Sequence, residues 1–200
     1  MNKQIIISIS REYGSGGHEI GRKLAEKLGL PFYDRNLLDE IAKKAGTDVS
    51  ELSQYDEKPK HFFLSRTVRG YSNNPAENIA ELQFALLKSK AADEDSFVVI
   101  GRCSDEIFNN IPGVSVLKIF ISGDWESKVQ RVIEKRSMDA KLAAKTIIKH
   151  DKNRLAYHDH FCEHRWGDAR SYDLSINSTR LGIDGSVDML VEYVKRYMKE

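Results

Sequence analysis

Short apolar runs alternate with helix-like patterns along this chain. The runs have the length of buried strands and cover residues 5–9, 32–33, 97–100, 116–121 and 174–176. Between them, apolar residues recur at helical spacing in residues 17–28, 36–44, 76–91, 125–135, 140–155 and 186–197. Strands that alternate with helices are typical of a parallel sheet with helices on both faces. We therefore expect a three-layer α/β/α architecture on a parallel five-stranded sheet.

Two segments depart from this alternation. Residues 47–74 show little periodicity and contain Pro59 and the polar turn Ser72-Asn73-Asn74-Pro75, so we expect a mobile insertion between core elements. Residues 124–157 are dense in charge, which indicates a pair of helices projecting from the core.

Composition narrows the class of protein. The chain has 200 residues, and its 31 basic and 30 acidic residues give a net charge of +1, too little for a broad nucleic-acid interface. Neither a signal peptide nor an apolar run of transmembrane length is visible, and Cys103 and Cys162 do not suggest a disulfide framework. We expect a single-domain cytoplasmic protein without nucleic-acid or membrane partners, and the sequence leaves its oligomeric state open.

The turn between the first predicted strand and the first predicted helix is rich in glycine. It reads Arg11-Glu12-Tyr13-Gly14-Ser15-Gly16-Gly17-His18-Glu19. A glycine-rich turn that leads into a helix is suited to an anion, because free backbone N–H groups and the helix dipole converge there. We expect a phosphate group to bind at this turn.

The turn does not match the standard phosphate-loop pattern G-x-x-x-x-G-K-[ST]. When Gly16 takes the last glycine of that pattern, Gly17 stands in the position of the lysine and Arg11 in that of the first glycine. The pattern therefore predicts phosphate binding and leaves phosphoryl transfer in question.

Arginine follows three of the five predicted strands, as Arg11, Arg35 and Arg102. In an open α/β sheet, ligands bind beyond the carboxyl ends of the strands. Solvated loop arginines are common, but three at this edge favour a site for an anion.

Several motifs together resemble the cytidylate kinase-like family, a branch of the P-loop nucleoside monophosphate kinases. The resemblance spans nearly the whole chain and rests on the segments 10–17, 20–21, 24–29, 32–35, 101–102, 151–154 and 172–178. It implies a P-loop NTPase fold with helical NMP-binding and LID insertions. The CORE would cover residues 1–33, 75–130 and 155–200, the NMP-binding region about 34–74 and the LID about 131–154.

The resemblance also implies an activity, ATP-dependent phosphoryl transfer to a nucleoside monophosphate, with CMP or dCMP as the first choice. ATP and Mg²⁺ would be the cofactors, and small-molecule nucleotides the partners. The D-x-N-R element would bring Asp151 to the sugar or base and Arg154 to phosphate, and Arg102 would meet the acceptor phosphate.

From the resemblance and the sheet-edge positions we assign roles as a hypothesis. The amides of Gly14, Ser15, Gly16, Gly17 and His18 would cradle the donor phosphates beside Glu19, with Arg11 in place of the missing lysine. Arg131, Arg136 and Arg154, with Lys135 as a further candidate, would close over the γ-phosphate. The acceptor would be bound by Asp34, Arg35, Arg66, Arg69, Arg102, Asp151 and Arg154.

The metal ligands are not determined by the sequence. The serine or threonine that holds Mg²⁺ in a standard phosphate loop is absent, which leaves Glu19 or Asp34 as a metal ligand. Loss of the lysine and of this hydroxyl leaves two alternatives open: a nucleotide-binding regulatory protein without kinase activity, and a kinase of another small metabolite.

Four residues near the end of the chain, His158, His160, Cys162 and His164, could be taken for a metal cluster. Their period-2 spacing would place them on one side of a strand and is unlike common zinc motifs, so we favour a packed turn over zinc. A base-stacking or LID-hinge role for Tyr157 or His158 is the other possibility. Cys103 has no paired base in the sequence, and we expect it to begin a helix.

Overall fold

A five-stranded parallel sheet forms the centre of the protein. The computed structural model describes residues 4–34, 36–46, 48–53, 67–68, 71–72, 74–93, 96–109 and 111–198. The strand order is β2-β5-β1-β6-β7, and every pairing in this sheet is parallel. The strands are β1 (Gln4–Arg11), β2 (Phe32–Tyr33), β5 (Phe97–Ile100), β6 (Val114–Ser122) and β7 (Leu174–Asn177). All five predicted strands are confirmed, with the sheet expected from the alternating pattern.

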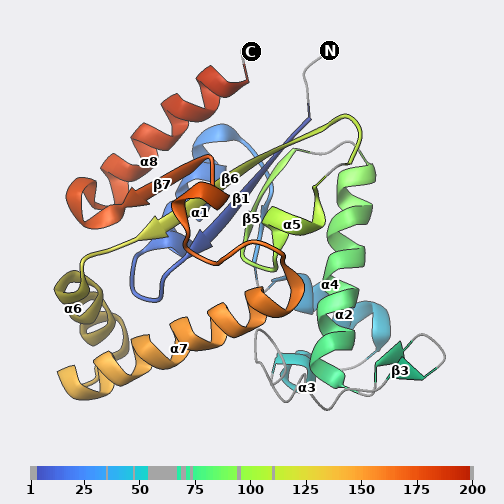
Figure 1. Cartoon of the computed structure of the whole chain (residues 1–200), viewed down its shortest axis with the longest axis horizontal. Coiled ribbons are helices and arrows are strands. Elements are labelled where there is room, and N and C mark those ends of the chain that lie inside the picture. The colour runs from blue at the N-terminus through green and yellow to red at the C-terminus, as the bar shows by residue number, and fades with distance from the viewer. Residues whose placement is uncertain are drawn as a thin grey trace.

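The central strand β1 shows why the chain forms three layers. Ile5, Ile7 and Ile9 are buried on one face in a cluster with α1 (Gly17–Leu28) and α8 (Ser178–Tyr197). Ile6 points to the other face and packs in a cluster with α2 (Asn36–Ala45) and α4 (Pro75–Ala92). Because successive side chains of a strand alternate between faces, a strand that is buried on both faces needs helices on both sides. Figure 1 shows the sheet between these helices.

Local signals fix most helix ends. The N–H of Gly29, at φ 66°, closes α1 on the carbonyls of Ala25 and Glu26. The side chain of Asn74 caps α4, whose first residue is a proline. The last helix, α8, begins at Ser178 and crosses a kink at Gly182, whereas the prediction began at 186.

The helices α6 (Trp125–Arg136) and α7 (Ala140–Phe161) confirm the pair predicted in the charge-dense segment. They pack together through Val132, Ala143 and Ile147. The second helix is longer than predicted because it does not project freely. Its last turns are buried against the core, where Tyr157 packs with Ala80 of α4 and with Cys103. In Figure 1, α7 runs below the sheet from α6 toward α4.

The remaining described elements are short. They are α3 (Val49–Ser53), the antiparallel pair β3 (Thr67–Val68) and β4 (Tyr71–Ser72), α5 (Ser104–Ile107) and a 3-10 helix at Ala169–Ser171. Much of the insertion predicted at 47–74 lies outside the described residues. Within the described part of the chain, no helix has the length and apolarity needed to cross a membrane.

Candidate phosphate-binding site

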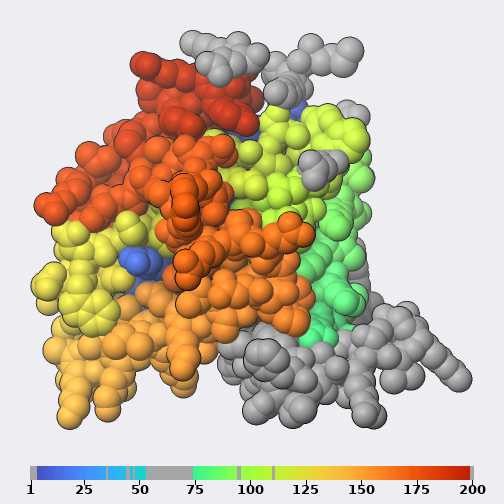
Figure 2. Space-filling model, viewed as in Figure 1, coloured from blue at the N-terminus to red at the C-terminus, as the bar shows by residue number. Residues whose placement is uncertain are grey.

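A cavity of about 440 Å³ lies beyond the carboxyl ends of β1 and β5, where α1 begins. Its walls come from the loop after β1, the first turn of α1, the segments after β2 and β5, and helices α6 and α7. Figure 2 shows this edge from one side, with the blue N-terminal segment visible between yellow α6 and the orange segment that includes α7. The lining residues are Arg11, Glu12, Tyr13, Gly14, Gly16, Gly17, His18, Glu19, Asp34, Ile100, Arg102, Arg131, Val132, Lys135, Arg136, His150, Asn153 and Arg154.

The loop after β1 has the backbone that an anion site needs. Gly14 and Gly16 adopt φ 81° and 82°, which L side chains rarely tolerate. No side chain caps α1 at Gly16, and the first N–H groups of a helix have no intrahelical acceptor. The hydroxyl of Ser15 is buried and donates to the carbonyl of Glu12 at 2.8 Å, so it shapes the loop and does not line the cavity.

Arg11 and Gly17 share one space. A Cβ on Gly17 would lie 2.6 Å from the Cβ and 3.1 Å from the Cγ of Arg11. The stem of Arg11 therefore covers the position from which a lysine at residue 17 would start. Arg11 itself ends β1 and lines the cavity.

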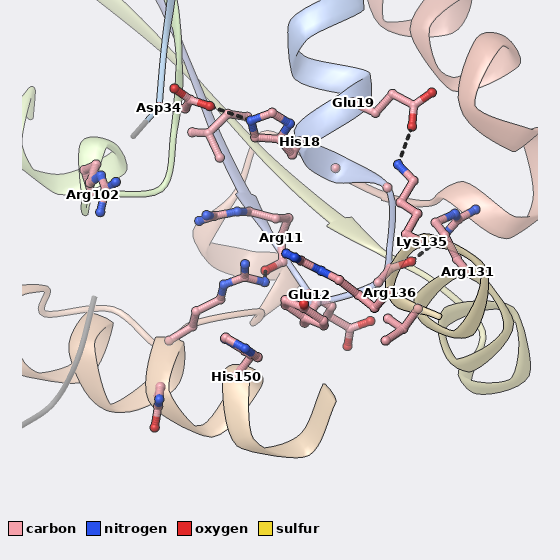
Figure 3. A pocket seen from close by; sticks show the side chains of 18 residues that line it. Arg11, Glu12, His18, Glu19, Asp34, Arg102, Arg131, Lys135, Arg136 and His150 are labelled. Atoms are coloured by element: carbon pink, nitrogen blue, oxygen red, sulfur yellow. Dashed lines mark hydrogen bonds and ion pairs between the residues drawn. The ribbon is translucent and has the colours of Figure 1, made fainter. Parts of the chain in front are cut away.

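Arg102 enters the cavity from the segment after β5. Its residue is only 3% exposed, and its φ of 62° lies in the left-handed region, as do those of Gly101 and Cys103. A bulky residue at such an angle is strained by about 1–2 kcal/mol. In Figure 3, Arg11, Arg102 and Arg136 extend toward one open space from three different elements.

Helix α6 brings three cations to the opening of the cavity. Arg131 donates from Nη1 to the carbonyl of Gly14 at 2.5 Å, and Lys135 donates from Nζ to Glu19 at 2.7 Å. The bond from Lys135 outweighs burial and lowers the pKa of Glu19. These contacts attach α6 to the phosphate loop and to α1, and Arg136 lies on the same helix.

Helix α7 forms a further wall of the cavity, which the sequence predicted through Asp151 and Arg154. Arg154 donates from Nη1 to the carbonyl of Arg11 at 3.2 Å and lies over the ring of Tyr13. The ring of Tyr13 stacks on His150 with centroids 4.2 Å apart. Tyr13, His150 and Asn153 were given no role from the sequence. The spacing of residues 150, 153 and 154 on one helix face could have indicated His150 and Asn153, whereas the stacking of Tyr13 has no such local signal.

Asp151 lies outside the cavity lining, which differs from the role assigned to it from the sequence. Its carboxylate accepts a hydrogen bond from the backbone N–H of Tyr13 at 2.6 Å and lies 3.8 Å from both Lys128 and Arg154. Burial raises the pKa of Asp151. The contacts give this residue a part in holding the phosphate loop against α7.

Asp34 lines the cavity at the end of β2. His18 lies 2.5 Å from its Oδ2, and this hydrogen bond outweighs burial and lowers the pKa of Asp34, with a smaller contribution from Arg102. The carboxylate is therefore ionised at neutral pH. The other predicted acceptor residues, Arg35, Arg66 and Arg69, lie outside the described residues.

The lining is dominated by positive charge. Six cationic side chains face three carboxylates, those of Glu12, Glu19 and Asp34. One of the six, Arg102, is almost fully buried and interacts electrostatically with the carboxylate of Asp34. The cavity is thus suited to a ligand that carries several negative charges.

The histidine-rich segment is helical and not a strand. His158 and His160 lie in α7, and Cys162 is its C-cap. Helical spacing places His158 and Cys162 near Asp105 of α5, whereas His160 pairs with Glu77. Tyr157 and His158 are buried outside the cavity, so the base-stacking role was wrong. Cys103 is the N-cap of α5, as predicted.

Hydrogen bonds set the charge state of this second cluster. Burial opposes ionisation of Asp105, but hydrogen bonds from His158 and His164 hold its pKa well below its usual range. Burial also opposes the charged form of His158, whose hydrogen bonds with Asp105 and Cys162 raise its pKa to about 9. A hydrogen bond with Cys103 outweighs burial at Cys162 and, with one from His158, lowers its pKa to about 7.

Comparison with known proteins places the chain among kinases. A sequence model of the cytidylate kinase-like family matches residues 6–180. The chain belongs to the cytidylate kinase-like family. The cytidylate kinase of Archaeoglobus fulgidus is 28% identical over 193 residues, which cover 94% of each chain. The assignment confirms the resemblance and supports a phosphotransferase.

Solved structures agree with the fold of a cytidylate kinase-like protein. An uncharacterized protein from Eubacterium ventriosum has a TM-score of 0.74 and 36% identity, over 96% of this chain and 99% of that one. The shikimate kinase of Bacteroides thetaiotaomicron has a TM-score of 0.54 at 18% identity, over 96% of this chain and 98% of that one. The latter likeness concerns the P-loop kinase fold alone.

Proposed function

We propose that this protein transfers the γ-phosphoryl group of ATP to a nucleoside monophosphate, with CMP or dCMP as the first choice. One observation carries the proposal: the glycine-rich loop and six cationic side chains face one cavity at the ligand edge of the sheet. Phosphoryl transfer depends mainly on positioning and on neutralising charge, and both could be supplied here.

The donor phosphates are assigned to the loop between β1 and α1. Amides of Gly14 to His18 would bind the β-phosphate, as helix N-termini bind anions. The guanidinium of Arg11 would take over the charge that a lysine supplies in a standard phosphate loop. Arg131, Arg136 and Arg154 would close on the γ-phosphate from α6 and α7, in the part of the chain that we assign to the LID, about 131–154.

The acceptor is assigned to the side of the cavity beyond β2 and β5. Arg102 would bind its phosphate, since a guanidinium fork matches phosphate oxygens in a bidentate way. Asp34 would orient the acceptor or bind the metal. The family implies that residues of the NMP-binding region, about 34–74, complete this side.

The residues that are present suit ATP with Mg²⁺. No side chain caps the start of α1 at Gly16, so the first N–H groups of the helix are suited to phosphate oxygens. Mg²⁺ is bound in such sites by one or two carboxylates together with substrate phosphates, and it neutralises charge on the transferred group. Asp34 is the stronger candidate ligand, because two lysines neutralise Glu19, Lys135 at 2.7 Å and Lys23 at 3.7 Å, whereas Asp34 is bonded to the single histidine His18.

The choice of CMP rests on relatives. The Archaeoglobus fulgidus protein named a cytidylate kinase aligns over nearly its whole length. At this identity the acceptor can have changed, so a different small metabolite and a regulatory role without transfer are the competing outcomes of the test.

The test is a panel assay with purified protein. ADP formation is measured with ATP, Mg²⁺ and each nucleoside monophosphate in turn, and nucleotide binding is measured in parallel by calorimetry. We expect ADP formation with CMP or dCMP above all other acceptors. Arg11→Ala should lower kcat about 100-fold, the loss typical of one donor to a developing negative charge. Arg22→Ala, on the exposed side of α1 and paired with Glu26, is the matched control and should keep full activity.

Two outcomes contradict the proposal. Nucleotide binding without ADP formation with any acceptor indicates a regulatory protein. Full activity of Arg11→Ala shows that Arg11 does not replace the lysine.

A further inference from the structure

A second group of chemically reactive side chains lies away from the phosphate cavity. Asp105 in α5, His158 near the end of α7 and Cys162 at the C-cap of α7 each place one ligand atom within 4.8 Å of the others. These residues do not line the cavity described above. The group joins two elements that are more than fifty residues apart in sequence.

Burial makes this group costly as it stands. Asp105 is 0% and His158 3% exposed. Among the described residues, Oδ1 of Asp105 and Nδ1 of His158 are buried without a hydrogen-bond partner. A buried polar atom without a partner is destabilising, so two of them in one cluster point to a further ligand.

The donor set selects the kind of ligand. A carboxylate, an imidazole and a thiol together suit a zinc-class divalent transition metal rather than Mg²⁺ or Ca²⁺, which prefer oxygen alone. In a tetrahedral site with metal–ligand distances of about 2.0–2.3 Å, ligand atoms lie about 3.3–3.8 Å apart. The observed separations, all within 4.8 Å, would have to shorten through side-chain shifts for the three atoms to meet one ion.

A supporting set of hydrogen bonds orients the carboxylate. His164 lies 3.1 Å from Oδ2 of Asp105 through Nε2 and 2.9 Å from Glu106 through Nδ1. Such carboxylate–histidine chains commonly hold metal ligands in place. Asp105 is thus fixed from one side, and its Oδ1 remains available on the other.

We propose that Asp105, His158 and Cys162 bind one zinc-class divalent metal ion, with His164 as a positioning residue for Asp105. The ion links the start of α5 to the end of α7. Because α7 also carries Arg154, and Arg102 precedes α5, the ion stabilises the junction between the two arginine-bearing segments. The site is separate from the proposed phosphoryl transfer and does not depend on it.

The test uses full-length protein without a histidine tag, stripped with a chelator and then titrated with Co²⁺ in the absence of nucleotide. We expect one equivalent to bind with d–d absorption and a thiolate-to-metal charge-transfer band, and Zn²⁺ to displace it. Cys162→Ser should abolish the charge-transfer band and weaken binding by about 100-fold or more, and His164→Gln should weaken it about 10- to 100-fold. His160→Gln, two residues from His158 and paired with Glu77, is the control and should bind as the wild type does.

Measurements on the wild-type protein test the site even if a substitution prevents folding. X-ray absorption of the zinc-loaded wild type should show a sulfur ligand together with nitrogen or oxygen ligands, and Zn²⁺ should raise the melting temperature. The proposal is overturned by folded wild-type protein that gives no cobalt spectrum, by a zinc shell without sulfur, or by a charge-transfer band that persists in folded Cys162→Ser. None of these readouts involves ATP, so failure here leaves the kinase proposal intact.

Discussion

The side chain of Arg11 occupies the space above Gly17: a methyl group on Gly17 would approach the Cβ of Arg11 to 2.6 Å. The two positions are therefore coupled. A protein with a glycine at residue 17 has room for the arginine stem at residue 11, and a lysine at residue 17 needs that stem to be absent. This coupling gives a physical reason why the standard lysine is missing while a cation remains on the same loop.

The first prediction is that lysine cannot simply be restored. Gly17→Lys should lower the free energy of unfolding by about 1–3 kcal/mol, the usual cost of overpacking, and should not raise phosphoryl transfer. In Arg11→Gly/Gly17→Lys the clash is removed, so stability should recover in part and activity should exceed that of Arg11→Gly alone. Urea unfolding and the CMP kinase assay measure the two effects.

A control for this experiment is Gly185→Ala in α8, where an added Cβ meets its nearest neighbour at 3.4 Å. That change should be neutral or stabilising, as alanine is preferred to glycine inside a helix. A Gly17→Lys protein as stable and active as the wild type would show that the two residues are not coupled.

The second prediction concerns Arg102, which is buried and has a positive φ. Hydrogen bonds to a charged group contribute about 1.5–3 kcal/mol, so Arg102→Gly should raise the KM for the nucleoside monophosphate about 10- to 100-fold. Glycine tolerates this backbone angle, and the free energy of unfolding should not fall through backbone strain. Steady-state kinetics with acceptor and ATP varied separately measure the effect.

Arg196→Ala, at an exposed position near the end of α8, is the matched control and should leave KM unchanged. A rise in the KM for ATP with no change for the acceptor would show that Arg102 serves the donor side instead.

Much of the fold followed from the hydrophobic pattern, because β1 carries buried isoleucines on both faces and therefore lies inside the sheet. The predicted helix ends were wrong where contacts between residues far apart in sequence determine how far a helix extends. Burial of Tyr157 and His158 extends α7 past its predicted end, and helix α8 continues backward across the kink at Gly182. The four-residue helix α5 is too short to give a periodic signal.

The site was predictable where its residues directly follow strands in the sequence. The phosphate loop and the arginines that end strands must meet at one edge of a parallel sheet. The role given to Asp151 was less successful, since its partner, the N–H of Tyr13, is 138 residues away in sequence. No local pattern indicates that contact, and the stacking of Tyr13 on His150 was missed for the same reason.

The third prediction separates the two candidate metal ligands. Asp34 is held ionised by its bond with His18, whereas Glu19 bonds to Lys135 and lies 3.7 Å from Lys23. We expect Asp34→Asn to raise the MgCl₂ concentration needed for half-maximal activity about tenfold, the loss typical of a perturbed metal site. Glu19→Gln should change it little. Activity against MgCl₂ at fixed ATP tests this, and the reverse order of effects would assign the metal to Glu19.

The fourth prediction uses the buried carboxylate of Asp151, whose pKa is raised by burial. A folded-state pKa above the unfolded value means that the folded protein binds this proton more tightly. The contribution of Asp151 to stability is therefore greatest at low pH and falls as pH rises above about 4, the unfolded value, and through the folded pKa. An asparagine keeps an acceptor for the N–H of Tyr13 but cannot ionise.

Asp151→Asn should therefore gain stability relative to the wild type as pH rises from about 4 toward neutrality. The substitution also removes the attraction to Lys128 and Arg154, which changes the free energy of unfolding by an offset. The shifted ionisation of Asp151 is reported by the slope with pH of the difference in this free energy between the two proteins. Urea unfolding of both proteins at a series of pH values measures that slope. Asp159→Asn, exposed on the same helix, supplies the control. A difference that stays flat, or that moves toward the wild type with rising pH, would show that burial does not raise the pKa of Asp151.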